Sequence, residues 1–297
     1  MKEGEIIMND KLKMIIAMSI FGTIGLFVKY IPLPSSVIAM VRGFIGTLFI
    51  FSFVKIRKIH ISKENIKRNL LLLIVSGGFI GANWILLFES YKYTTVAMAT
   101  LCYYLAPVFV MIAAPFVLKE RMTIKKLCCI VVAFGGMILV SGVIGGDMGA
   151  NSITGMALGC GAAILYAAVV LMNRFIKDIS AYDKTMVQLG AATVVVVPYV
   201  LLTVKQSDVV LTPITVGLLL FVGIVHTGFA YTLYFGSMGG LKTQTIALFS
   251  YLDPIIAIVA SVIILQEKAT LTTIIGAILI LGSTMVSEIS FKKEEKS

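Results

Sequence analysis

The chain has 297 residues, of which 59% are apolar and 13% are charged, and its formal net charge is +10. A soluble domain carries about 25% charged residues, so this chain has too little polar sequence to cover a soluble surface. The composition therefore argues against a soluble enzyme and against a nucleic-acid-binding protein. Basic residues of membrane proteins collect in cytoplasmic loops, so the positive charge requires no nucleic-acid partner.

Apolar runs of about 20 residues, the length needed to cross a bilayer, occur along the whole chain. A spanning helix is predicted in each of ten segments: 12–29, 35–55, 69–90, 94–118, 124–144, 153–173, 184–204, 213–237, 243–265 and 270–289. The first run has the length of a signal sequence but lacks a small-x-small cleavage site, so we predict an uncleaved helix. The links are short, and the predicted fold is an all-α integral membrane protein with one membrane domain.

The distribution of Lys and Arg predicts the orientation of these helices. With the N-terminus inside, 20 of the 25 basic residues fall on the inner side and four fall on the outer side, while Arg42 lies within a helix. This bias predicts a multi-pass protein of the plasma or inner membrane with both termini in the cytoplasm. The basic segment 55–68 is accordingly interpreted as an orientation signal.

The two halves of the chain match when one is shifted by 147 residues along the other. The segment 104–107 (YLAP) falls on 251–254 (YLDP), and 118–120 (LKE) falls on 265–267 (LQE). A shift of 145 aligns the first helices of the two halves, so that Phe21-Gly22 and Lys29 meet Tyr166-Ala167 and Arg174. Such a match over consecutive helices indicates an internal repeat.

Residues 1–145 and 146–297 each contain five predicted helices. Because five is an odd number, the second copy must enter the membrane from the opposite side. We therefore predict two inverted five-helix repeats within one membrane domain, an arrangement typical of secondary transporters.

The paired motifs resemble those of the EamA-type branch of the drug/metabolite transporter superfamily, over about residues 12–289. The first helix resembles the aromatic–Gly pattern of that family, with Phe21 where Trp is usual, and Arg42 in the second helix also matches. The resemblance implies a ten-helix fold with a central cavity and, in most members, export. Members move amino acids, other metabolites, nucleobase-type compounds and drugs, so the resemblance does not choose the cargo.

Candidate substrate-binding residues are the polar and aromatic side chains expected deep in the predicted spans. They are Asn83, Trp84, Tyr104, His226, Tyr231, Tyr234, Tyr251 and Asp253. Aromatic rings with a polar group bind ligands well, and a buried amide needs a partner. The alternative is that these side chains only pack helices together.

Ionisable groups at membrane depth are costly and are candidates for function. Asp253 lies beside a proline and replaces an alanine of the first half; it is a candidate proton carrier or an acceptor that ties two helices. His226 is expected to share that proton or to bond a neighbouring hydroxyl. We expect Arg42 to pair with Glu89; the alternatives are that it extends to the surface or attracts a carboxylate of the cargo.

Motifs for catalysis and for energy coupling by nucleotides are missing from the sequence. It contains neither GxxxxGK[ST] nor HExxH, and its four cysteines lie inside apolar runs without metal-ligand spacing. We predict a secondary transporter, not an enzyme, without cofactor or metal, whose partners are a small-molecule substrate and the lipid bilayer. Its oligomeric state stays open, a homodimer included.

The predicted function is export of small metabolites such as amino acids by alternating access. The alternatives are uptake or exchange of a nucleobase- or cofactor-like metabolite and, from other classes, a membrane-embedded enzyme or a channel.

The predicted topology can be tested by labelling His60→Cys in a background without the four native cysteines. We expect no reaction with a membrane-impermeant maleimide in intact cells and rapid reaction after permeabilisation, because residue 60 lies in a predicted inner loop. Labelling of intact cells would reject the orientation.

Overall fold

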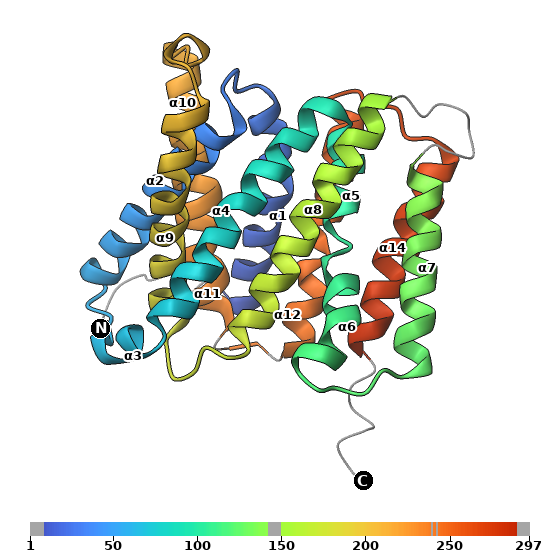
Figure 1. The fold of residues 1–297 in the computed structure, drawn as a ribbon, viewed down its shortest axis with the longest axis horizontal. Helices are drawn as coiled ribbons and strands as arrows, with labels where there is room; N and C mark the ends of the chain where they lie inside the picture. Colours follow the sequence, from blue (N-terminus) through green and yellow to red (C-terminus); the bar gives the residue numbers. More distant parts are fainter. Residues whose placement is uncertain (1–8, 142–149, 239, 242, 290–297) are drawn as a thin grey trace.

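The computed structural model describes residues 9–141, 150–238, 240–241 and 243–289, and every regular element among them is helical (Figure 1). The helices of the first half are α1 (Asp10–Lys29), α2 (Ser35–Ile56), α3 (Lys63–Arg68), α4 (Leu70–Tyr93), α5 (Val96–Tyr103), α6 (Ala106–Val117) and α7 (Ile124–Val140). Those of the second half are α8 (Ala150–Asn173), α9 (Ala181–Thr203), η2 (Gln206–Asp208), α10 (Pro213–Phe221), η3 (Val222–Phe229), α11 (Ala230–Met238), α12 (Thr243–Ser250), α13 (Leu252–Ile263) and α14 (Leu271–Ile289). The predicted all-α class is confirmed, whereas the chain termini lie outside the described residues.

Seven helical stretches among the described residues are long and apolar enough to cross a membrane. They are α1, α2, α4, α5 with α6, α8 from Ser152, α9, and the stretch from α10 to α11. The other predicted spans correspond to the 17-residue helix α7 and to the shorter apolar stretches Leu248–Ile263 and Leu271–Ser287. The chain is thus a multi-pass membrane protein, and the ten-span topology stays a prediction.

Three of the predicted spans are interrupted, which the apolar pattern did not reveal. The fourth breaks between α5 and α6, where Pro107 occupies the first turn of α6, and the ninth breaks between α12 and α13, just before Pro254. Proline lacks a backbone N–H and its ring clashes with the preceding turn, so continuous helical bonding is lost at both places. The eighth span contains the π-helical segment η3.

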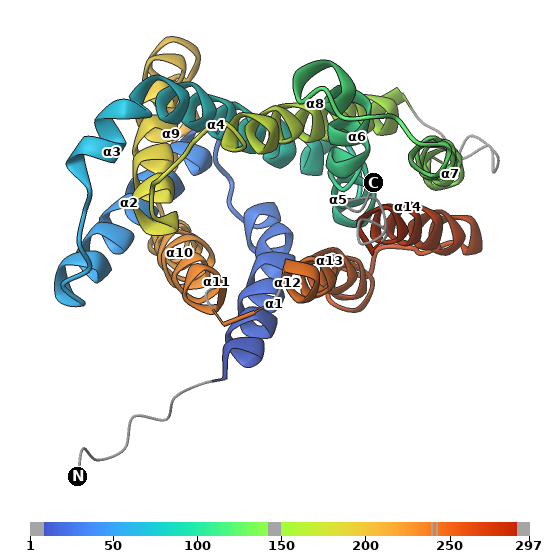
Figure 2. The same ribbon diagram turned by 90° about the horizontal axis from the view of Figure 1, so that it is seen from below.

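The helices surround a shared interior, as Figure 2 shows from below. Helix α4 packs on α8 and α9 along one side, while α1 packs between α11 and α13 on the other. Helix α2 lies against α9 and η3, and α7 pairs with α14 at the far edge. Residues of α1, α2, α4, α5, α8, α11 and α13 are therefore able to approach the same interior.

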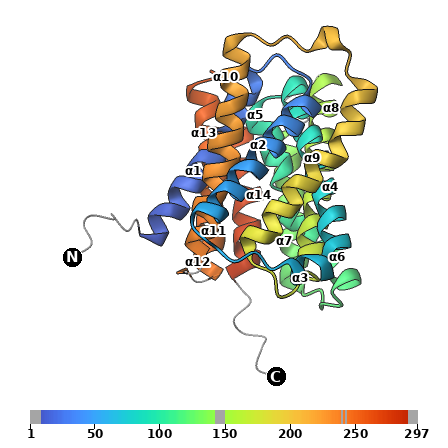
Figure 3. The ribbon, with the colours of Figure 1, turned by 90° about the vertical axis from the view of Figure 1, so that its left-hand side faces the viewer.

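The loops predicted to be cytoplasmic gather at one end of the molecule. These are residues 57–62 with the short helix α3, residues 118–123, and residues 174–180 (Figures 1 and 3). Arg68 forms an ion pair with Asp178, and Asn69 Nδ2 donates to the Lys177 carbonyl at 3.0 Å, which joins the first loop to the third. The end that faces the cytoplasm stays a prediction.

Equivalent segments of the two halves have matching backbone conformations and hydrogen bonds. Figure 1 shows α1 and α7 running toward the upper end, whereas α8 and α14 run toward the lower end. Lys119 and Gln266, which precede the two motif glutamates, have positive φ angles of 57° and 55°. The Glu120 N–H bonds the Ala114 carbonyl as the Glu267 N–H bonds that of Ser261. The likeness of the halves therefore extends from sequence to backbone geometry.

Helices α7 and α14 approach each other closely through two glycines. A Cβ atom added to Gly136 would lie 2.7 Å from the Gly276 carbonyl oxygen, and one added to Gly276 would lie 2.5 Å from that of Gly136. A Cβ on the neighbouring Gly135 would meet nothing within 4 Å. Only one of these adjacent glycines is thus required by packing.

We expect Gly136→Ala to destabilise the protein by about 1–3 kcal/mol, because the added methyl group forces the two backbones apart. Gly135→Ala is the matched control and should leave the melting temperature in the same detergent unchanged or slightly raised. Equal melting temperatures of the two variants would contradict the packing described here.

Candidate functional site

Arg42 is a buried cation about two turns from the beginning of α2, with 6% of its surface exposed. Its Nε donates to Thr227 Oγ1 of η3 at 2.7 Å, and its guanidinium lies over the Trp84 ring of α4, 4.1 Å from the centroid. A Cβ atom at Gly46, one turn along α2, would collide with the Thr227 side chain, so glycine there permits the close approach. The π face of Trp84 and the hydroxyl of Thr227 replace part of the water that the charge has lost.

The predicted ion pair between Arg42 and Glu89 is wrong. Glu89 instead accepts from Ser35 Oγ at 2.7 Å and from Lys92 Nζ at 2.9 Å, at the end of α4. Glu89 lies five residues beyond Trp84, more than one helical turn along α4, while Arg42 stays at the level of the tryptophan. No ion pair joins Arg42 to an acidic side chain in the part of the chain that the structure describes.

Asp253 lies in the first turn of α13, just after the break in the ninth predicted span. Its Oδ2 accepts a hydrogen bond from the Tyr104 hydroxyl at 2.5 Å, and Tyr104 stands at the corresponding break between α5 and α6. The two interrupted spans therefore meet through these side chains. Asp253 and Arg42 are also close enough to interact electrostatically, without a direct ion pair.

Tyrosines from four helical stretches surround the two charges. Tyr103 at the end of α5 packs on Tyr166 of α8, with ring centroids 5.5 Å apart, and Tyr231 of α11 packs on Phe21 of α1 at 5.1 Å. Tyr91 of α4 completes the set that interacts with Arg42 and Asp253. We call Tyr91, Tyr103, Tyr104, Tyr166, Tyr231 and Tyr234 the interior tyrosines.

Several side chains of this cluster keep accessible surface. Tyr166 is 41% exposed, yet its electrostatic partners are Tyr231, Tyr234 and Asp253 on the opposite helices α11 and α13. Tyr231 and Asp253 are likewise only partly buried.

His226 lies beside this cluster, within electrostatic reach of Arg42, but its direct contacts are with other residues. It is 1% exposed, its Nε2 lies 3.1 Å from Thr23 Oγ1, and its ring packs against Phe27 and Phe221. This is the hydroxyl-bonded arrangement that the sequence left as one of two alternatives. Among the described residues His226 makes no hydrogen bond with Asp253, so the sharing of a proton has no direct path here.

Asn83 points away from the interior that its neighbour Trp84 helps to form. Its Nδ2 donates to the Ala162 carbonyl of α8 at 2.5 Å, and the residue is 1% exposed. The amide thus ties α4 to α8. Tyr251 is 7% exposed at the break between α12 and α13, and Tyr234 packs on Phe21 and Phe235.

The structure therefore brings together Trp84, Tyr104, Tyr231 and Asp253 with Arg42. Thr227, which shares a helical stripe with the candidates Tyr231 and Tyr234, also bonds Arg42. The residues that the sequence did not place in the candidate site are Phe21, Tyr91, Tyr103 and Tyr166. Only the repeat carried a signal for two of them, since Phe21 and Tyr166 are equivalent positions. Tyr103 is the last residue of α5, just before the break. The sequence predicts an unbroken helix there, and an unbroken helix assigns side chains near the break to the wrong face.

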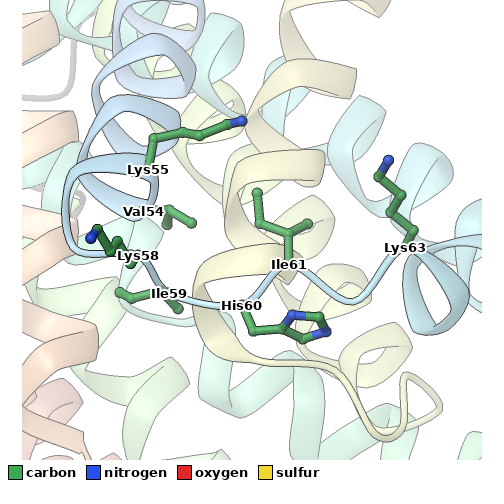
Figure 4. Close-up of a pocket in the computed structure, with 7 residues that line it drawn as sticks. All are labelled: Val54, Lys55, Lys58, Ile59, His60, Ile61 and Lys63. Atoms are coloured by element: carbon green, nitrogen blue, oxygen red, sulfur yellow. The ribbon is translucent and has the colours of Figure 1, made fainter.

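An open pocket of about 370 Å³ lies elsewhere, beyond the end of α2 (Figure 4). It is lined by Val54, Lys55, Lys58, Ile59, His60, Ile61 and Lys63. Its lysine side chains point in different directions, so they do not converge on one ligand position (Figure 4). This region belongs to the basic loop interpreted from sequence as an orientation signal.

Comparison with known proteins identifies the family. The sequence model of the EamA-like transporter family matches residues 11–142 and again residues 153–288. The chain is 31% identical over 280 residues to the uncharacterized transporter YxxF of Bacillus subtilis (strain 168), covering 91% of this chain and 86% of that protein. It is 25% identical over 194 residues to a protein named as a probable amino-acid metabolite efflux pump of Salmonella typhimurium, covering 62% and 64%.

A solved crystal structure shares the fold, with a TM-score of 0.67 and 17% sequence identity, over 94% of this chain and 98% of that chain. The relatives are named as transporters, not as enzymes, and the family resemblance seen in the sequence motifs is confirmed. The chain belongs to the EamA-like transporter family.

Proposed function

We propose that this chain is a secondary transporter that exports small metabolites such as amino acids across the plasma or inner membrane by alternating access. The observation that carries the proposal is the cluster of two opposite charges, Arg42 and Asp253, among the interior tyrosines, several of which keep accessible surface. Nε of Arg42 bonds Thr227, and its terminal nitrogens have no hydrogen-bond partner among the described residues. They are suited to a carboxylate, while Asp253 is suited to an ammonium group.

The proposed transport cycle uses two inverted repeats, residues 1–145 and 146–297, with ten spans in all. Three observations support this arrangement: the two separate family matches, the opposite directions of α1 and α8, and the matching geometry before Glu120 and Glu267. Two related halves of opposite orientation supply two conformations of similar energy, one open to each side.

A second candidate is uptake or exchange of a nucleobase- or cofactor-like metabolite. The interior tyrosines favour it, because their rings can stack on a flat heterocycle. A thermal-shift screen of the purified protein against amino acids, nucleobases and sugars would separate the two. Export is supported by the name of the Salmonella relative, and counterflow in proteoliposomes of known orientation tests it.

We expect Trp84→Ala and Tyr231→Ala each to weaken binding of the cargo found by that screen about tenfold or more. Trp84 holds the Arg42 guanidinium in place, and Tyr231 lies within electrostatic reach of the same charge. Phe44→Ala is the matched control, since Phe44 lies on the same helix as Arg42 but is 53% exposed. Unchanged affinity in both site variants, measured by calorimetry, would reject this site.

We expect Asp253→Asn to exchange cargo across liposomes but no longer to concentrate it along a pH gradient. Asparagine keeps the acceptor for the Tyr104 hydroxyl but cannot carry a proton. Asp178→Asn, on an exposed loop, is the control and should accumulate cargo as the parent does. If gradient-driven accumulation survives in Asp253→Asn, proton coupling through this residue is wrong.

A further inference from the structure

The Glu267 side chain joins three helices at the upper end of the molecule, and it is only 7% exposed. Its Oε1 accepts from Lys29 Nζ at 2.6 Å and from the Val96 N–H at 3.0 Å, while Oε2 accepts from the Ala97 N–H at 3.3 Å. The carboxylate therefore fastens the end of α13 to the end of α1 and to the beginning of α5. A negative charge at a helix N-terminus and a charged hydrogen bond to lysine are both favourable. We call this set of contacts the Glu267 latch.

The repeat places an equivalent set of residues at the opposite end of the molecule. Glu267 corresponds to Glu120, Lys29 to Arg174, and the beginning of α5 to the beginning of α12. Lys119 and Gln266 have the same left-handed backbone, so each glutamate leaves its helix end in the same way. The chain thus carries the parts of a second latch at the lower end.

The second latch is not formed in this conformation. The Glu120 side chain is 41% exposed, and its partner is Lys126 Nζ, six residues along the chain, at 3.1 Å. Arg174 is exposed, and no ion pair joins it to Glu120 among the described residues. Helix packing also differs between the two ends. Helix α5 lies against α13 at the formed latch. The equivalent pair is α12 and α6, but the main contacts of α12 are with α1, α13 and α14.

We propose that Glu267 and Glu120 are alternating latches that hold the two ends of the transporter closed in turn. The Glu267 latch closes the upper end in this structure. In the opposite conformation it opens, and Glu120 bonds Arg174 and the first N–H groups of α12. One set of charged contacts is thereby exchanged for an equivalent set, which keeps the two conformations close in free energy. This inference rests on the alternating-access function proposed above.

Double electron–electron resonance can test the latches in the full chain reconstituted in lipid nanodiscs. Spin labels at Tyr93→Cys and Ala269→Cys, in a background without the native cysteines, report on the upper end; both positions are exposed. Glu267→Gln keeps the shape but removes the charge, so the population with the longer distance should rise about tenfold or more. Lys29→Gln should act in the same direction but less strongly, because the N–H contacts of α5 remain.

The matched variant Glu120→Gln should act in the opposite direction and reduce the population with the longer distance, since the alternative latch is weakened. Because Glu120 is exposed, the substitution is compatible with folding, and the melting temperatures of all variants establish that each is folded.

Two populations whose ratio is the same in the parent, in Glu267→Gln and in Glu120→Gln would overturn the latches but leave alternating access standing. A single population in all three would contradict alternating access itself. A lower melting temperature of Glu267→Gln without a longer distance would make Glu267 a fixed strut and also overturn the proposal.

Discussion

A positive charge within an apolar bundle has to be solvated by the protein itself, and Arg42 sets this requirement for the whole interior. Its guanidinium lies over Trp84 and bonds Thr227, so α2, α4 and η3 must all approach the same point. Gly46 on α2 makes the approach to η3 feasible, because a side chain there would meet Thr227, while Gly43 lets α9 lie close, because a side chain there would meet Thr193. One buried cation therefore links three of the helical segments around the site.

The candidate site is chemically asymmetric although the two halves of the chain carry matching motifs. Asp253 corresponds to Ala106 in the first half, while both halves keep the tyrosine and the proline of the motif. The breaks at these prolines bring Tyr104 and Asp253 into contact, so the carboxylate of one half is held by the hydroxyl of the other. The two halves thus share the tyrosine and the proline but differ at the position that carries the carboxylate.

Much of the architecture was predictable from the sequence, because apolar runs, basic loops and repeated motifs each have a direct physical cause. Trp84, Tyr104, Tyr231 and Asp253 could be proposed for the same reason, as polar or aromatic groups at membrane depth. The partner of Arg42 could not be predicted from the sequence. Whether Arg42 meets Glu89 or the Trp84 ring depends on the level along α4 that the Arg42 side chain reaches. Asn83 shows the same limit: its neighbour on the helix faces the interior, while its own amide bonds α8. Tyr103 was hidden by the break that follows it.

The close contact between Gly136 and Gly276 bears on how such a chain can arise. Helix α7 is the last helix of the first half and α14 the last of the second, so the contact joins corresponding helices. Two separate copies of one such half could form the same contact with each other, as in any twofold assembly. Gene fusion of two such copies would then require no new surface at this edge, only a linker between them.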